Sequence, residues 1–296
     1  MPPGSKLHLL EQLSFSHEAA RVIRSQSRDV SLQYHERIED VLSAVQEPRT
    51  YGLLPLDNSS SGPVDKHLNA LLERKDLSIV FDLPWQVRMC VGGVQGATLS
   101  EARTVCSHPK AIEQSSEFLS RHPRITGREN FETTSRAAHS IQNVGDPTRI
   151  VLASELAIDA LHLRKLAVDV SNLKGYLNQT SMAGIHSNGI KRLPSELDRY
   201  HALDLTIENE PGVLWNILQV IARARVDLTS LHSRKADDGQ YRFFLEMDRE
   251  GSPDRFALMA DALAATKGIA HRRWLGSWNV RYGADKNGKA PNFAVR

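Results

Sequence analysis

The feature that most constrains this chain is the alternation of short apolar runs with amphipathic segments along its first 160 residues. Residues at helical spacing predict helices over 14–25, 35–45, 64–73, 109–120, 133–143 and 155–161. Short apolar or alternating runs predict strands over 51–55, 77–83, 85–93, 105–108 and 150–153. Strands that repeatedly lead into helices indicate an α/β fold with an open parallel or mixed sheet, in which ligands bind near the strand ends.

Polar clusters stand where several of these strands end. Residues 51–62 read YGLLPLDNSSSG, in which 57–61 form one cluster, and further clusters occupy 107–108, 133–135 and Ser154. Asn, Ser and Gly are turn formers, so each cluster taken alone is explained by a polar surface turn. They also carry hydroxyl and amide donors suited to an oxygen-rich small ligand. Their recurrence at strand ends favours a binding cleft.

A second unit is expected after the polar, proline-containing stretch 187–199. A strand from about residue 201 leads through an acidic turn at 208–210 into a helix that starts at Pro211 and Gly212. A strand over 226–232, a hairpin turn at 236–239, a strand over 241–247, a helix over 253–265 and a strand over 269–275 follow. The order βαββαβ predicts a ferredoxin-like sandwich of roughly 75 residues.

Composition excludes several classes of protein. A chain of 296 residues has room for two domains, and its 41% hydrophobic and 24% charged residues are typical of a soluble protein. A net charge of +2 argues against nucleic acid, and the apolar runs are too short for a membrane span. The first twelve residues have no signal-peptide core, so a cytoplasmic location is expected. Cys90 and Cys106 have apolar neighbours and are expected to be buried thiols, and no metal-ligand spacing is present.

Five segments in order resemble the motifs of prephenate dehydratase followed by a C-terminal ACT regulatory domain. They are SFSHEAA at 14–20, PLDNSSSG at 55–62, SHPKA at 107–111, TTSRAA at 133–138 and AS at 153–154. In the family these read (T/S)-(Y/F)-S-H-x-A-A, P-x-E-N-S-x-x-G, S-H-P-Q-A, S-T-A-x-A-A and I-A-S. The resemblance implies a dehydratase domain at 1–190 with two lobes like those of periplasmic binding proteins. Lobe one is expected at about 1–84 and 170–190, lobe two at about 85–169, the ACT domain at 200–278 and a tail at 279–296.

The resemblance also implies a site. Dehydratases of this family convert prephenate to phenylpyruvate, carbon dioxide and water without a cofactor, and Thr180 stands where the family has its hydrogen-bond donor to the departing hydroxyl. The substrate-binding residues expected from the motifs are Ser14, Ser16, Asn58, Ser59, Ser107, Thr133, Thr134 and Asn178. A site for an L-phenylalanine effector is expected at Pro211, Gly212, Val213, Leu214, Ser233 and Arg234, in a homodimer or tetramer. A purely structural dimerisation module is the alternative for this domain.

Three motifs depart from the family pattern. Thr180-Ser181-Met182 stands for T-R-F, Leu10-Glu11-Gln12-Leu13 for G-P-x-G, and residues 231–235 for a motif containing E-S-R-P. Serine cannot replace the bidentate charge of arginine, for which Arg136 and Arg149 are candidates to compensate. Lost glycines indicate a reshaped pocket. Three hypotheses therefore stand, in this order: a prephenate dehydratase of phenylalanine biosynthesis, a non-aromatising prephenate decarboxylase of secondary metabolism, and a non-catalytic ACT-containing binding protein.

Overall fold

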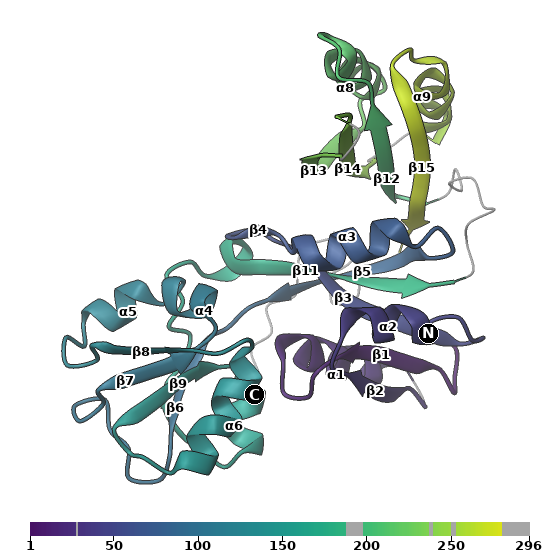
Figure 1. Ribbon diagram of the computed structural model, residues 1–296. Helices are drawn as coiled ribbons and strands as arrows, with labels where there is room; N and C mark the ends of the chain where they lie inside the picture. Colours follow the sequence, from purple (N-terminus) through teal and green to yellow (C-terminus); the bar gives the residue numbers. More distant parts are fainter. Residues whose placement is uncertain (28, 188–197, 237–238, 250–252, 280–296) are drawn as a thin grey trace.

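The computed structural model describes residues 1–27, 29–187, 198–236, 239–249 and 253–279. Two lobes lie side by side and a third, smaller unit stands on the first of them (Figure 1). The first lobe contains β1 (Lys6–Leu10), α1 (Phe15–Gln26), β2 (Ser31–His35), α2 (Ile38–Ala44), β3 (Thr50–Asn58), β4 (Gly62–Pro63), α3 (Asp65–Glu73), β5 (Ser78–Gln86) and β11 (Gln179–His186). The second lobe contains β6 (Cys90–Gly93), β7 (Thr104–Ser107), α4 (Pro109–Glu113), α5 (Ser116–Ser120), β8 (Gly127–Asn130), α6 (Thr134–Val144), β9 (Arg149–Ala153), α7 (Glu155–Ala160) and β10 (Arg164–Ala167). A short 3₁₀ helix, Gly175–Asn178, leads into β11.

The first lobe is a mixed sheet in the order β2-β1-β3-β11-β5. The strands β2, β1 and β3 are parallel, and β11 runs antiparallel between β3 and β5. Helix α1 packs against one face, where Ile23 joins a buried cluster with Leu9 and Met182. Helices α2 and α3 cover the other face, where Leu71 packs with Ile79. The amphipathic helices thus each bury one apolar stripe against the sheet.

The second lobe has its own five-stranded sheet in the order β10-β6-β9-β7-β8. The strands β7, β8 and β9 are parallel, and β6 pairs antiparallel with β9. The chain leaves the first sheet at the end of β5, residue 86, and returns to it at the start of β11, residue 179. Two segments therefore connect the lobes, and at this junction the start of β11 pairs with the end of β3.

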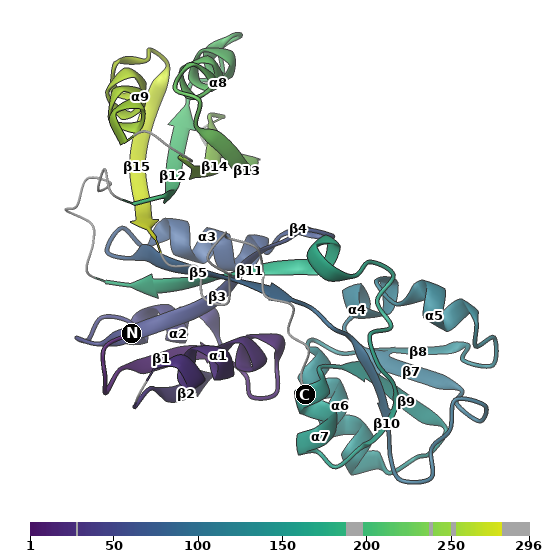
Figure 2. The ribbon, with the colours of Figure 1, turned by 180° about the vertical axis from the view of Figure 1, so that it is seen from behind.

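The third unit contains β12 (Tyr200–Ile207), α8 (Val213–Arg223), β13 (Asp227–Lys235), β14 (Tyr241–Asp248), α9 (Pro253–Ala265) and β15 (Ile269–Trp278). Its strand order, β13-β14-β12-β15, is that of the expected ferredoxin-like sandwich, and α8 packs beside α9 (Figure 2). The end of β15 reaches the first lobe, where Gly276 pairs with Ile79 of β5. A Cβ atom at residue 276 would lie 1.9 Å from the Ile79 carbonyl oxygen, so only glycine permits this junction.

The α/β class and the mixed sheets are confirmed, while several expected boundaries are wrong. Residues 85–93 do not form one strand, because β5 ends at Gln86 and the chain turns into the other lobe before β6. Residues 109–120 form two short helices, since the chain breaks at Gln114 and Ser115. The strands β1, β2, β8, β10 and β11 were not expected. Most of the connecting stretch 187–199 and of the tail 279–296 lies outside the described residues.

Two expectations from composition can be compared with the structure. Cys90 and Cys106 are both free and buried, as their apolar neighbours predict. Within the described ranges, no helix is long and apolar enough to span a membrane.

Candidate active site

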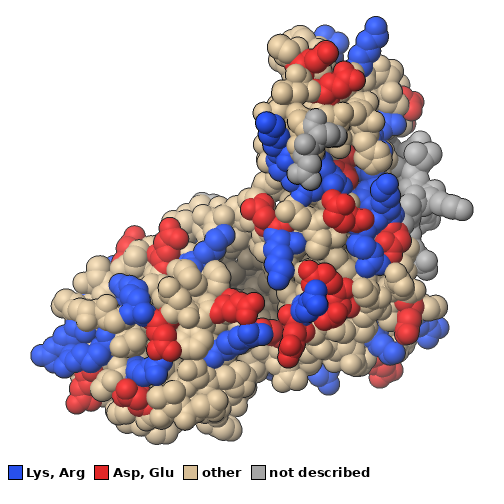
Figure 3. All heavy atoms as spheres, in the orientation of Figure 1, with Lys and Arg blue, Asp and Glu red and all other residues tan. Residues whose placement is uncertain are grey.

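A cleft of about 470 Å³ lies between the two lobes, and the space-filling view shows a hollow at this place (Figure 3). Its floor and walls are in part apolar, formed by side chains such as Phe15, Ile38, Val87, Met89 and Met182. Polar lining residues are Glu11, Ser14, Ser16, Glu36, Asn58, Ser61, Lys66, His67, His108, Lys110, Gln114, Glu132, Thr133, Thr134, Ser135 and Thr180. A cleft with an apolar wall and convergent donors suits an amphipathic ring compound.

Thr180 and Asn58 meet at the buried end of this cleft, as expected from the sequence. They face each other because β3 and β11 pair antiparallel with Thr180 opposite Asn58. Asn58 Nδ2 donates a hydrogen bond of 2.9 Å to Thr180 Oγ1, and Asn58 Oδ1 accepts from the Ser60 and Ser61 backbone amides at 3.0 and 3.1 Å. Since the Asn58 amide uses its oxygen for the loop, its nitrogen must face Thr180. The Thr180 hydroxyl proton is left to donate into the cleft.

Residue 181, where the family has arginine, does not line the cleft. Side chains alternate along a strand, so Ser181 leaves β11 on the face opposite Thr180 and Met182. There Ser181 Oγ donates a 2.7 Å hydrogen bond to Asp82 Oδ1 of β5. Serine at this position therefore contributes no group to the cleft wall. The change that does reach the cleft is methionine in place of phenylalanine at 182.

Two histidines on the cleft wall have defined proton positions. His67 Nδ1 lies 2.9 Å from the Pro55 carbonyl oxygen and must donate to it, so Nε2 of the neutral ring is an acceptor. His108 Nδ1 accepts from the Lys110 backbone amide at 3.2 Å, so its Nε2 carries the proton. Burial lowers the pKa of both rings below the ordinary value. At neutral pH the cleft thus holds one neutral imidazole acceptor and one neutral imidazole donor.

The charges around the cleft are of both signs (Figure 3). Lys66, on the first turn of α3, and Lys110, on α4, line one part of it. Among the described residues neither lysine has an acidic partner within ion-pair distance, so both are free to meet a ligand carboxylate. Glu11, Glu36 and Glu132 line the remainder.

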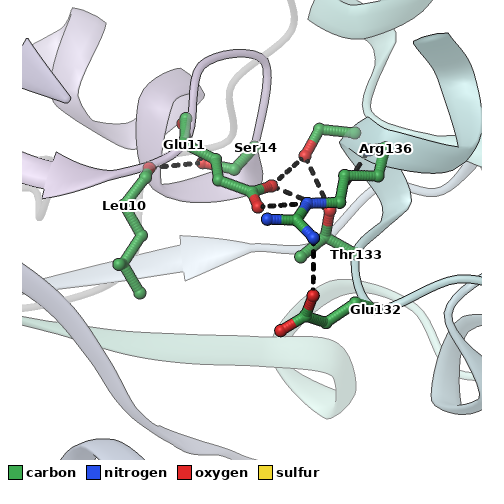
Figure 4. Close-up of polar contacts among 7 residues, drawn as sticks. Leu10, Glu11, Ser14, Glu132, Thr133 and Arg136 are labelled. Carbon is green, nitrogen blue, oxygen red and sulfur yellow. Dashed lines mark hydrogen bonds and ion pairs between the residues drawn. The ribbon is translucent and has the colours of Figure 1, made fainter. Parts of the chain in front are cut away.

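The Glu11 carboxylate reaches across the cleft to the other lobe (Figure 4). Its Oε2 accepts from Thr133 Oγ1 at 2.8 Å and from Ser135 Oγ at 2.6 Å, and its Oε1 accepts from Arg136 Nε at 3.1 Å. Arg136 also contacts Glu132 through Nη1 at 2.6 Å. Arg136 therefore has two acidic partners and supplies no free charge to the cleft. Arg149, the other candidate to replace the lost charge, forms an ion pair with Glu129 and does not line the cleft.

The loop that carries Glu11 has an unusual backbone. Glu11 and Leu13 have φ angles of +32° and +64°, which are rare for residues with a side chain. Ser14 caps α1 by accepting from the His17 amide, and its hydroxyl lies 3.0 Å from the Glu11 carbonyl oxygen. His17 Nδ1 accepts from the Leu13 amide at 3.0 Å. The start of α1 thus fixes the loop.

The residues expected to bind substrate divide into two groups. Ser14, Ser16, Asn58, Thr133 and Thr134 line the cleft together with Thr180. Ser59, Ser107 and Asn178 do not line the cleft, although Asn178 lines an adjoining cavity that shares Ser61, Lys110 and Gln114 with it. Ser107 Oγ donates to the Leu152 carbonyl at 2.6 Å, and Ser59 Oγ accepts from the Gln179 amide at 2.9 Å. Asn178 lies behind Asn58 and donates to the Val87 carbonyl at 3.2 Å.

The expected effector residues lie in the third unit at the ends of β12 and β13. Pro211 and Gly212 are exposed in the turn before α8, and Gly212 has a φ of +92°. Val213 is buried in the core of this unit and Leu214 packs at its edge. Ser233 is exposed, whereas its neighbour Arg234 lies on the opposite face of the sheet near Asp204 and Glu73. Ser233 and Arg234 therefore cannot contact one ligand from the same face.

Several residues that line the cleft were not predicted from the sequence. Glu11 was expected only as a lost proline, and Lys66, His67, Lys110 and Gln114 were not expected at all. The available signal for Lys66, His67 and Lys110 was position, because α3 and α4 start soon after a polar cluster and residues of their first turns face the cleft. Gln114 follows the end of α4 and has no such signal. The described residues contain no group of three or more His, Cys, Asp or Glu side chains that could hold a metal ion.

The prephenate dehydratase family model matches residues 8–181, more than half of the chain. The chain belongs to the prephenate dehydratase family. A bifunctional chorismate mutase/prephenate dehydratase of Enterobacter agglomerans is 27% identical over 245 residues, which is 81% of this chain but only 61% of that protein. A family member is thus similar over much of the chain but is itself considerably longer.

Solved structures agree on the fold. A prephenate dehydratase of Arthrobacter aurescens, solved in complex with L-Phe, has a TM-score of 0.77 at 20% identity and covers 93% of this chain and 90% of its own. GqqA, described as a novel type of quorum quenching acylase, has a TM-score of 0.78 at 23% identity over 93% of this chain and 98% of its own. At these identities the likeness shows the fold alone, including the third unit.

Proposed function

We propose that this protein is a prephenate dehydratase that converts prephenate to phenylpyruvate for L-phenylalanine biosynthesis. The observation that carries the proposal is the Thr180 hydroxyl, which faces the cleft with its oxygen hydrogen-bonded by Asn58 at 2.9 Å. A hydroxyl oxygen that accepts a hydrogen bond becomes a better donor through its own proton. The site therefore holds a donor at the buried end of a cleft that fits one ring.

The reaction breaks two bonds of the substrate. The electron pair of the bond between the ring and its carboxylate moves into the ring as carbon dioxide leaves. Aromatisation then expels the ring hydroxyl on the opposite side as hydroxide, which accepts the hydrogen bond of Thr180 and takes a proton from solvent to become water. Stabilising charge that develops on this oxygen lowers the barrier. The apolar wall formed by Phe15, Val87 and Met182 holds the ring, and Lys66 and Lys110 lie where they can meet the carboxylate of the side chain.

Substitution of Thr180 tests the proposal. Thr180→Val keeps the shape of the side chain but removes the donor, so we expect phenylpyruvate formation to fall about 100-fold or more. Thr180→Ser is the matched control, because it retains the hydroxyl, and it should keep a substantial part of the wild-type rate. If Thr180→Val forms phenylpyruvate as fast as the wild type, Thr180 takes no part in the mechanism.

We further propose that the third unit is an ACT regulatory domain that binds L-phenylalanine in a homodimer or tetramer. Its ferredoxin-like strand order and the exposed turn at Pro211 and Gly212 support this role. The proposal predicts that L-phenylalanine lowers dehydratase activity and that Gly212→Val weakens this inhibition, because a branched side chain at a φ of +92° distorts the turn. Light scattering would give the oligomeric state. Dehydratase activity that does not change when L-phenylalanine is added would favour a purely structural role for the third unit.

A further inference from the structure

The contacts of Glu11 are those that proteins give to the carboxylate of a ligand. Two hydroxyls and a guanidinium surround it at the start of α6, a helix of eleven residues. Charge-assisted donors of this kind at the positive end of a helix dipole form a good carboxylate site. All three donors belong to the opposite lobe, 122 to 125 residues along the chain from Glu11. The protein's own carboxylate thus fills a carboxylate site in the cleft.

The backbone at Glu11 has a conformation that a proline at this position could not adopt. Proline, which the family has at this position, is restricted to a φ near −65° and cannot adopt +32°. A positive φ also costs energy for glutamate and persists only where surrounding contacts maintain it. Here the backbone is held by Ser14, whose hydroxyl donates to the Glu11 carbonyl, and by the Glu11 amide, which donates to the His35 carbonyl at 3.1 Å. The bonds to Thr133, Ser135 and Arg136 then hold the Glu11 side chain in the direction that this backbone gives it.

The local charge leaves no place for a second carboxylate beside Glu11. Arg136 is the one cation in the group, and it already pairs with Glu11 at 3.1 Å and Glu132 at 2.6 Å. The group therefore carries a net charge of one negative unit, which repels an entering anion. A ligand with two carboxylates can place one near Lys66 and Lys110, but the other must compete with Glu11 for the site on α6.

We propose that Glu11 determines the specificity of this cleft as an internal competitor for a substrate carboxylate. The inference rests on the proposed function for the identity of the dicarboxylate, prephenate. The substrate binds productively only when Glu11 has left the α6 site, so its apparent affinity is reduced by the fraction of molecules in which that site is open. Replacement of Glu11 opens the site permanently.

Kinetics of Glu11→Ala test the competition. If the site is open in about a tenth of wild-type molecules, KM for prephenate falls about tenfold while kcat stays within about threefold. Glu11→Gln removes the charge but leaves an amide that fills the same space, so its KM should fall less. Glu36→Ala is the matched control, because it removes a negative charge from the same cleft without emptying the α6 site. An equal fall of KM in Glu36→Ala would overturn the proposal.

A second experiment needs no turnover and so separates this inference from the proposed function. In Glu11→Ala, acetate at about 100 mM should occupy the emptied site and raise Tm by about 2 °C or more relative to the same concentration of chloride. The wild type should show no such difference, and adding Ser135→Ala to Glu11→Ala should abolish it. Glu11→Gly, which adopts a positive φ without strain, provides a second variant should the alanine chain fold poorly. If acetate changes Tm equally in the wild type, Glu11→Ala and Glu11→Gly, the inference is overturned, whether or not the protein turns over prephenate.

Discussion

Asn58 is held at both ends, and this fixes the direction of its amide. Its oxygen accepts from the backbone amides of Ser60 and Ser61, while its nitrogen donates to Thr180 Oγ1 and, at 3.3 Å, to Asn178 Oδ1. A buried amide with donors on its oxygen cannot flip without losing those bonds. Asn58 therefore acts through Thr180, by leaving the threonine proton as the donor to the cleft.

The substitution Asn58→Asp follows from this geometry. The carboxylate keeps the oxygen that the loop amides need, but it replaces the nitrogen that faces Thr180 with an acceptor. Thr180 would then donate its proton to residue 58, and we expect kcat to fall about 100-fold or more with little change in the KM for prephenate. Steady-state kinetics, with circular dichroism as the check on folding, measures this. A variant with normal kcat would show that the Thr180 proton does not act in the reaction.

At the scale of single residues, the sequence predicts what depends on motif order and misses what depends on backbone geometry. Thr180 and Asn58 follow from conspicuous polar segments whose pairing the sheet then brings about. Ser107 stands in an equally conspicuous segment, yet its hydroxyl is used by the neighbouring strand. The position of Glu11 in the cleft could not be predicted, because the local sequence does not indicate a φ of +32° or a hydrogen-bond partner more than 120 residues away.

Among the elements, α3 connects the cleft to the third unit. Its first turn carries Lys66 and His67 on the cleft wall, and its last carbonyls accept from arginines of the third unit. Arg242 and Arg273 donate to the Leu72 carbonyl at 2.7 and 2.9 Å. Positive groups at the C-terminal end of a helix complement its dipole and satisfy its free carbonyls.

Asp204 holds both arginines, and its removal should destabilise the protein. The Asp204 side chain is only 1% exposed and lies 2.7 Å from Arg242 Nε and 3.5 Å from Arg273 Nη2. Without it, the largely buried Arg242 and Arg273 share only the exposed carboxylate of Glu73, which lies 2.9 Å from Arg242 Nη1, so Asp204→Ala is expected to cost about 3 kcal/mol of unfolding free energy. Arg37→Ala, which breaks the exposed pair with Glu39, should leave the unfolding free energy almost unchanged. Urea denaturation measures the unfolding free energy of both variants. A similar loss of unfolding free energy in the two would contradict this account of α3.

Strongly periodic elements were predictable, whereas short ones were not. The amphipathic helices near 14–25, 64–73 and 133–143 appear close to their expected positions. The strands β1 and β2 are short and mixed in polarity, and β2 lies at the edge of its sheet, so no apolar run identifies them. The chain break within 109–120 depends on how α4 and α5 pack on the second lobe, which local pattern does not report.

On the scale of the whole molecule, Glu18 links the lobes on the far side of α1. Glu18 Oε1 accepts from the Leu156 amide of α7 at 3.0 Å, beside a second cavity of about 600 Å³. Burial is the main cause that raises the pKa of Glu18 to about 7 from its ordinary 4.5. The folded protein therefore holds a proton that the unfolded chain releases between pH 4.5 and 7, so this group's contribution to stability is lost as pH rises through that range.

Glu18→Gln isolates this contribution, because glutamine mimics the protonated acid and keeps the acceptor for Leu156. We expect the two proteins to be equally stable near pH 4.5 and the glutamine variant to be more stable at pH 8 by on the order of 3 kcal/mol. Buried His8 and His201, whose pKa values fall to about 4, cause the opposite pH trend in both proteins and cancel in the difference. Urea denaturation at several pH values measures it. A difference that does not change with pH would contradict the account.

The overall architecture was predictable in class, since strands alternate with helices and then βαββαβ follows. The sequence did not predict that the sheet of the first lobe continues into the third unit. This continuation depends on the single backbone contact that Gly276 permits with Ile79, and a glycine in a strand has no distinctive sequence signal of this role.

The products formed from prephenate test the central claim most directly. The wild-type protein is incubated with prephenate at neutral pH, and phenylpyruvate and carbon dioxide are measured together. A dehydratase site with the Thr180 donor predicts one phenylpyruvate for each carbon dioxide released. Carbon dioxide without an aromatic product would make the protein a non-aromatising decarboxylase, and the absence of both products would make it a binding protein, so either result would contradict the account.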